Sequence, residues 1–204
     1  MTKKILDQLL KLAADQLGVR EATGQNDGEP SRRYMGGRRE PWCAHFIAWL
    51  FRSVGHPLPG DVVATRLTAN PIASVARMKR ELMKRELYFD KEVKTTISFD
   101  ENGAATTRNI VPVPGCLAFF SDRGDSDASA TGQHVELVIG VDADHFAELT
   151  PDGIKAALHL SIITIGGNVS DGGKTGLIVG TRKHDVDKTK RLVGFGFPFG
   201  LEAA

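Results

Sequence analysis

The sequence of 204 residues has few cysteines, no long apolar run and no excess of either charge. Its two cysteines, Cys43 and Cys116, are too few for a disulfide scaffold, and too few for a structural zinc site unless histidines contribute. No stretch of about 18 apolar residues occurs, so we expect no membrane span. Lys and Arg total 26 against 25 for Asp and Glu, a balance that gives electrostatic binding of nucleic acid no support.

The N-terminus also lacks an ordinary secretion signal. Lys3 and Lys4 resemble the basic end of a signal peptide, but Asp7, Lys11 and Asp15 interrupt the stretch that would have to be apolar. We therefore expect that any target outside the cytoplasm is reached by another route.

What is present is an ordinary globular composition, with 41% hydrophobic and 25% charged residues. A chain of this length buries roughly 70% of the surface that its unfolded form exposes, so it can build a core without metals or disulfides. We find no repeat and no linker, and we expect one domain over residues 1–204 and a monomer. The 22 glycines indicate many short connections.

Helical spacing of apolar residues comes first along the chain. It predicts helices over 3–17, from Pro41 to about Val54, and over 72–87, with an ordered loop over 23–41. The period then changes to two. An Asn-Gly pair between two Thr-rich runs predicts a hairpin, and residues 88–111 look like an added hairpin that shapes substrate access. Five further short strands are expected at 116–120, 134–139, 160–165, 177–180 and 192–195. Helices followed by strands predict an α+β fold in which N-terminal helices pack on a C-terminal antiparallel sheet.

Cys43 is the candidate nucleophile. Pro41 favours a helix that begins nearby, which would place Cys43 in the first turn, where free backbone N–H groups stabilise a thiolate. The thiolate is the reactive form of cysteine. The alternative is that Cys43 is a buried packing residue, since free cysteine is often buried.

A cysteine nucleophile needs a base, and His134 is the best placed of six histidines. It follows a polar loop over 122–131 and opens a predicted strand, whereas His45 diverges from Cys43 on the same helix. The remaining histidines read as surface or strand-end residues: His56, His145, His159 and His184. The base needs an acceptor that orients it. Asn168 in Gly166-Gly167-Asn168 could supply it, and the alternative is a simple turn.

With these residues assembled, the sequence resembles the CHAP family, the cysteine, histidine-dependent amidohydrolases and peptidases. This family belongs to the wider papain-like group that includes NlpC-type wall peptidases. The resemblance runs from about residue 5 to 198, and Pro41-Trp42-Cys43-Ala44-His45-Phe46 is its most specific part. It is also carried by Gly18–Glu21, Asn26–Gly28, Tyr34, Val113–Phe120, Gln133–Val138, Gly166–Asn168 and Gly194–Pro198.

The resemblance implies a papain-like fold with Cys43 as nucleophile, His134 as general base and then acid, and Asn168 holding the imidazole. The backbone N–H of Cys43 would stabilise the oxyanion. Gln25 or Asn26 are candidates for the second oxyanion donor. Trp42, Asn26 and Gln133 are candidate substrate-binding residues. No cofactor and no metal are implied.

Four positions depart from the family pattern. Gln133 stands where Gly is frequent, Glu136 where a small residue is frequent, and Cys116 where Asp is frequent. Gly166 stands where a Glu often precedes the Asn by two residues, which leaves Asn168 as the one predicted orienting residue. We read Cys116 as a buried strand residue.

The expected function is a cysteine amidohydrolase or peptidase that cleaves an amide bond in bacterial peptidoglycan. Without a secretion signal it would act on the cell wall or periplasm as a phage lysin or a secreted antibacterial effector, the latter with an inhibitory immunity protein as partner. The alternative is a catalytically impaired module of the same fold that binds wall material or a partner protein. Four arginines before the nucleophile could attract an anionic wall polymer, but a solvated loop is the preferred reading: Arg32, Arg33, Arg38 and Arg39.

Overall fold

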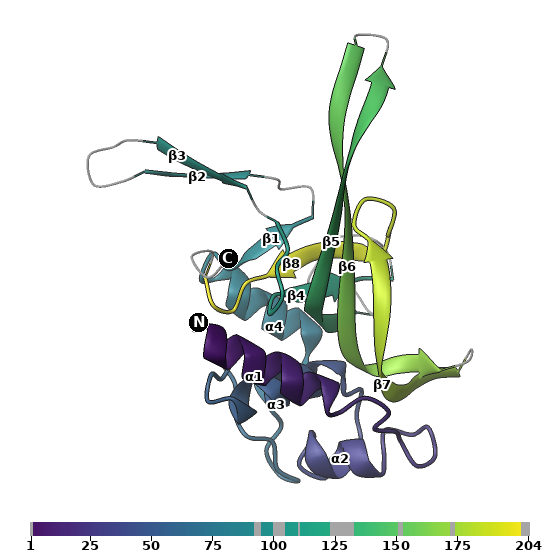
Figure 1. Cartoon of the computed structure of the whole chain (residues 1–204). Helices are drawn as coiled ribbons and strands as arrows, with labels where there is room; N and C mark the ends of the chain where they lie inside the picture. The colour runs from purple at the N-terminus through teal and green to yellow at the C-terminus, as the bar shows by residue number, and fades with distance from the viewer. Residues whose placement is uncertain are drawn as a thin grey trace.

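The computed structural model describes residues 2–91, 95–99, 105–109, 111–122, 133–150, 153–171 and 174–200. Helices precede the strands along the chain, and the strands of the main sheet pair antiparallel, as expected for an α+β fold. Figure 1 shows the helices gathered on one side of this sheet. No helix in the described ranges is both long enough and apolar enough to traverse a lipid bilayer.

The helices differ from the predictions mainly at their ends. The first, α1 (Lys3–Ala14), stops three residues short of the predicted end, and the helix predicted over 72–87 is split by extended backbone at Ser74 into η1 (Pro71–Ala73) and α4 (Val75–Met83). The predicted loop over 23–41 contains a short helix, α2 (Glu29–Arg33), which begins after Gly28 and has proline in its first turn. The helix that begins at the candidate nucleophile Cys43 is α3 (Cys43–Ser53).

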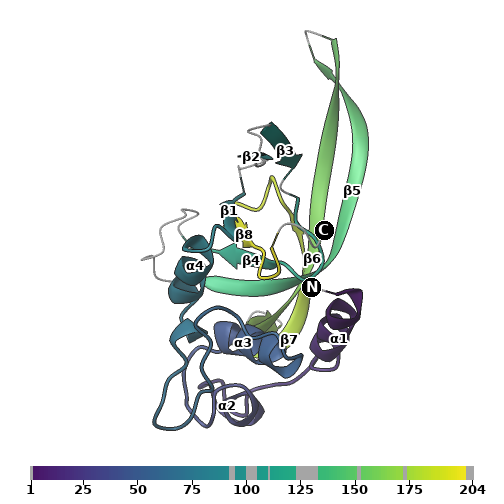
Figure 2. The same cartoon turned by 90° about the vertical axis from the view of Figure 1, so that its left-hand side faces the viewer.

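The main sheet has six strands in the order β1-β8-β4-β5-β6-β7. Its edge strand β1 (Tyr88–Asp90) was not predicted, because a three-residue strand leaves almost no periodic signal. The other members are β4 (Leu117–Phe120), β5 (His134–Thr150), β6 (Gly153–Asp171), β7 (Lys174–Asp185) and β8 (Leu192–Gly196). Figures 1 and 2 show that β5 and β6 continue as a two-stranded ribbon well beyond the rest of the sheet. The predicted strands over 134–139 and 160–165 are therefore the inner parts of longer strands.

The Thr-rich hairpin is present as β2 (Thr95–Phe99) paired with β3 (Ala105–Asn109). These strands form a separate two-stranded sheet. Because β1 pairs with β8 in the main sheet, the start of the predicted insertion over 88–111 belongs to the main sheet. The turn around Asn102-Gly103 and most of the predicted polar loop over 122–131 lie outside the described residues.

Helix α3 lies at the centre of the protein and is buried along most of its length. It packs against β5 and β6 on one side and contacts α1, α4 and η1 on the others. The sheet approaches α3 closely at Gly167, where an added Cβ would lie 2.6 Å from the Trp42 ring and 2.8 Å from Phe46 Cβ. A side chain at this position would therefore push the nucleophile helix away from β6.

Candidate active site

The structure brings Cys43, the first residue of α3, together with His134, the first residue of β5. Cys43 and His134 lie close enough for the charge and hydrogen bonding of the imidazole to act on the thiol, and the backbone groups of Val135 and Ala44 act in the same direction. Cys43 is only 4% exposed, yet it lines a surface cavity. The two residues predicted as nucleophile and base are thus brought together at the junction of helix and sheet.

The electrostatics of this pair favour a thiolate beside an imidazolium. Burial alone would raise the pKa of the Cys43 thiol, but the charge and hydrogen bond of His134 outweigh it, so that pKa lies below its ordinary value of 9.0. Burial alone would lower the pKa of His134, but the charge and hydrogen bond of Cys43 and the contact with Glu136 raise it to about 10. Both shifts favour the reactive form of Cys43 at a lower pH than an ordinary thiol would allow.

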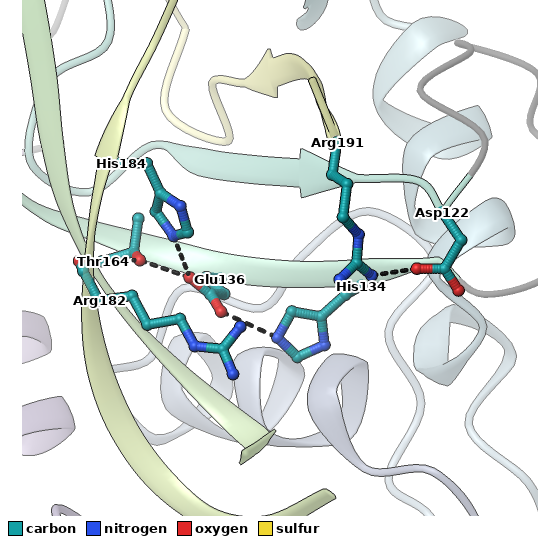
Figure 3. A network of polar contacts seen from close by, with 7 residues as sticks. All are labelled: Asp122, His134, Glu136, Thr164, Arg182, His184 and Arg191. Atoms are coloured by element: carbon teal, nitrogen blue, oxygen red, sulfur yellow. Dashed lines mark hydrogen bonds and ion pairs between the residues drawn. The ribbon is translucent and has the colours of Figure 1, made fainter. Parts of the chain in front are cut away.

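The carboxylate that orients His134 is Glu136, two residues further along β5. Its Oε1 accepts a hydrogen bond from His134 Nε2 at 3.0 Å, which leaves Nδ1 of the ring for the thiol. Its Oε2 accepts hydrogen bonds from the Thr164 hydroxyl and from His184 Nε2, the latter at 3.1 Å. Figure 3 shows the three donors converging on this one carboxylate. Residues two apart on a strand share a face, so the position of Glu136 beside His134 follows from strand geometry.

Glu136 is 1% exposed and ionised. Burial alone would raise the pKa of this carboxyl, but hydrogen bonds from His134 and His184, the His134 charge and the Thr164 hydroxyl hold it well below its ordinary range. A buried carboxylate with this many donors fixes the ring of His134 and stabilises its charged form.

Gly166 makes room for Glu136. β5 pairs with β6 so that Leu137 faces Ile165, which places Glu136 beside Gly166. A Cβ added at Gly166 would lie 2.8 Å from Glu136 Cγ and 3.3 Å from its Cδ. The two positions at which the sequence departs from the pattern of the family it resembles, Glu136 and Gly166, are therefore neighbours on adjacent strands, and β5 supplies the carboxylate at this place.

The predicted orienting role of Asn168 needs correction. His134 Nε2 is bonded to Glu136, and the Oδ1 atom of Asn168 is buried with no hydrogen-bond partner among the residues that the structure describes. Asn168 sits at an irregularity in the β6–β7 pairing with a positive φ of 62°, which turns it away from the regular strand direction. It nevertheless lines the same cavity as His134 and Glu136.

Two of the three predicted substrate-binding residues do not face the site. Trp42 is 0% exposed, its Nε1 donates to Glu21 Oε1 at 2.5 Å, and its ring stacks on Tyr34. The backbone N–H of Asn26 donates to Glu21 Oε2 at 2.8 Å, and Asn26 lines neither cavity at the site. Both residues are therefore structural, held by a buried carboxylate that the sequence analysis did not single out. Gln25 likewise lines neither cavity.

The third, Gln133, lies between two cavities. The first has a volume of about 640 Å³ and is walled by His134, Glu136 and Asn168. The second has a volume of about 590 Å³ and contains Cys43. Gln133 lines both of them. Cys43 thus lines the cavity on one side of Gln133 and His134 the cavity on the other, which would let a molecule lie across the pair.

The remaining candidates have other environments. His184, which the sequence analysis read as a surface or strand-end residue, lies near the end of β7. It is also a partner of Glu136, and only the fold could reveal this contact because 48 residues separate the two. His45 is buried against Glu40 Oε1 at 2.8 Å, and Cys116 is buried with a pKa that burial raises to about 12. Three of the four arginines that precede Cys43 form ion pairs with Glu29 or Glu40: Arg32, Arg33 and Arg38. Arg32 and Arg33 belong to α2, so the predicted solvated loop is helical at these two residues. Within the described ranges, no cluster of three or more His, Cys, Asp or Glu side chains is arranged to hold a metal ion.

The lowered pKa of the Cys43 thiol should be measurable as a change in its reactivity with pH. We expect Cys43 to react with iodoacetamide at pH 7 faster than an ordinary thiol, and to gain less rate between pH 7 and pH 9, because its lowered pKa leaves a larger thiolate fraction at pH 7. Above pH about 10, where His134 loses its proton, the rate should change as the ion pair is lost. Peptide mass spectrometry after timed alkylation would follow Cys43 and Cys116 separately. A Cys43 rate that rises nearly tenfold per pH unit up to about pH 8 and levels off above pH 9 would mean an ordinary thiol.

Comparison of the chain with protein-family models, with curated proteins and with solved structures gave no match.

Proposed function

We propose that the protein is a cysteine hydrolase of amide bonds, with a papain-like fold of the CHAP type and bacterial peptidoglycan as its substrate. The observation that carries the proposal is the series Cys43, His134 and Glu136, in which His134 lowers the pKa of the thiol, the pKa of the imidazole is raised, and the imidazole is hydrogen-bonded to Glu136. A nucleophile, a base and a group that orients the base are the parts that acyl transfer needs. The choice of peptidoglycan rests on the sequence resemblance.

The proposed reaction has two halves. The Cys43 thiolate attacks the carbonyl carbon, and the tetrahedral intermediate collapses as His134 gives its proton to the departing amine. This leaves a thioester on Cys43 and releases the amine product. A water molecule then gives a proton to His134 and attacks the thioester, which releases the carboxylic acid and restores the thiolate. The backbone N–H of Cys43, at the start of α3, would stabilise the oxyanion in both halves.

A binding module of the same fold is the competing proposal, suggested by the missing carboxylate at Gly166. The position of Glu136 supports the enzyme against it, because Glu136 supplies a carboxylate to His134 from the adjacent strand. An impaired site would have no need of a buried, ionised carboxylate, which costs free energy to desolvate unless it is well hydrogen-bonded.

The proposal is tested on purified peptidoglycan. We expect the protein to release soluble fragments, and mass spectrometry of those fragments identifies the bond as sugar–peptide or peptide–peptide. Prior alkylation of Cys43 should stop the release, while a Cys116→Ser protein, altered only at the inert thiol, should release fragments at the unaltered rate. Release that survives complete alkylation of Cys43 would overturn the proposal.

We also propose that the protein reaches the wall as a phage lysin or a secreted antibacterial effector. An effector of this kind would need an inhibitory immunity protein in the producing cell. Expression of the protein directed to the bacterial periplasm, with and without its neighbouring genes, distinguishes the two: only an effector should be neutralised by a neighbouring gene product.

A further inference from the structure

The cavity beside His134 has a strongly basic wall. Four cationic side chains line it, from β7 and from the turn that leads to β8: Arg182, Lys188, Lys190 and Arg191. Glu136 is the single carboxylate among the described residues of this wall. The whole chain has a net charge of only +1, so this local excess of positive charge does not reflect a generally basic surface.

Neighbouring acids do not cancel this charge. Glu136 is already engaged by two histidines and a hydroxyl. Lys188 pairs with Asp185 at 3.3 Å, and Arg191 pairs with Asp122 (Figure 3), but Lys188 and Arg191 both lie at the surface, where such pairs are weak. Among the described residues, neither the Arg182 guanidinium nor the Lys190 ammonium has an ion-pair partner within 4.0 Å. The cavity therefore presents a positive potential next to the catalytic base.

The reaction decides which half of the substrate meets this wall. If the proposed function is right, His134 must protonate the departing amine, so the amine half of the substrate lies on the His134 side of Cys43. The acyl half then lies in the second cavity, whose wall is largely apolar around Pro71, Ala73 and Val75. The basic cavity is thus on the side of the leaving group.

We propose that the cavity beside His134 binds a carboxylate carried by the amine half of the substrate. Guanidinium and ammonium groups at Arg182 and Lys190 would hold the carboxylate by charge-assisted hydrogen bonds. Asn168, which lines the same cavity, adds a polar residue to this wall. The inference names the substrate chemistry of the proposed hydrolase and rests on that function.

The potential is tested without any substrate. Cys43 is treated with two methanethiosulfonates of similar size, one bearing a sulfonatoethyl group and one a trimethylammonioethyl group. Each reaction forms a mixed disulfide on Cys43 and releases methanesulfinate. We expect the ratio of the anionic to the cationic rate to fall about fivefold or more in an Arg182→Gln/Lys190→Gln protein, because two positive charges are removed from the cavity that adjoins the cavity of Cys43 at Gln133.

The matched control is Lys4→Gln/Lys11→Gln on α1, which removes the same charge from exposed positions outside the cavity wall. Its ratio should equal that of the unaltered protein. An unchanged ratio in the Arg182→Gln/Lys190→Gln protein, or an equal fall in the α1 control, would refute the positive potential of the cavity beside His134.

The carboxylate is tested with purified peptidoglycan and with the same material after its carboxylates have been converted to amides. We expect the initial rate of fragment release to be at least about tenfold lower on the amidated wall, and the Arg182→Gln/Lys190→Gln protein to lose this preference. Equal rates on both walls would refute the carboxylate assignment while leaving the hydrolase intact. Absence of release from either wall would refute the peptidoglycan proposal, while the methanethiosulfonate ratio would still report on the cavity.

Discussion

A Cys43→Ala protein should lose about 10⁵-fold in its rate of release from peptidoglycan, because the covalent route disappears with the thiol. The substitution removes a single sulfur at the start of α3, a residue that is 4% exposed, and the helix keeps its backbone hydrogen bonds. We therefore expect circular dichroism and thermal unfolding close to those of the unaltered protein. The loss is large enough that turbidity of a peptidoglycan suspension would measure it.

Cys116→Ala is the matched control for this change. Cys116 is also buried, precedes β4 directly, and has a raised pKa instead of a lowered one. It should lose about 1 kcal/mol of stability from the vacated volume and keep its hydrolytic rate. Hydrolysis that persisted in the Cys43→Ala protein, or that vanished only with Cys116, would assign the chemistry to another residue.

The second large effect concerns the carboxylate and its cross-strand neighbour. Glu136→Gly should lower the hydrolytic rate about 10²–10⁴-fold, because His134 loses both its orienting acceptor and a stabilising negative charge. The pH at which Cys43 becomes a thiolate should rise in parallel, since a less basic His134 stabilises the thiolate less. Alkylation rates followed across pH would measure this second change independently of the substrate.

Exchange of the two residues should restore part of what the single change removes. In the double variant Glu136→Gly/Gly166→Glu, the carboxylate enters the same volume from β6, because a Cβ at position 166 points at the Glu136 side chain. We expect the double variant to recover at least about tenfold of the lost rate, while Gly166→Glu alone crowds two carboxylates and loses both rate and stability. A double variant no better than Glu136→Gly would mean that the carboxylate position on β5 is indispensable.

The sequence predicted the order of elements well and their extents poorly. Periodicity is strong where one face is buried, so α3 and the inner parts of β5 and β6 were found close to where they lie. The ribbon formed by the outer parts of β5 and β6 was not predicted, because the alternation of apolar and polar residues is weaker there than in the inner segments. The short elements β1 and α2 were not predicted, because a few residues are too few to show a period.

The site shows a different limit. Cys43 and His134 could be chosen from local signals, a helix start and the first residue of a strand after a polar loop. The residues around the imidazole could not be chosen from local signals, because their positions depend on strand register. They meet only when β5, β6 and β7 are paired: Glu136, His184 and Gly166. The clue in the sequence was that positions 136 and 166 both depart from the pattern of the family it resembles. The sequence does not show that the two residues are neighbours, whereas in the structure the Glu136 side chain occupies the space beside Gly166.

Because His134 and Glu136 belong to the same strand, their mutual placement is set by covalent connectivity across a single intervening residue, Val135. The register of β5 with β6 shifts beyond Val138, and that of β6 with β7 shifts after Gly166. The position of an acceptor on β6 relative to His134 would therefore change with any change in these registers. An acceptor on the same strand as His134 does not depend on these registers. The ribbon beyond Gly140 can thus lengthen, shorten or bend over evolutionary time without a change in the position of Glu136 relative to the His134 ring.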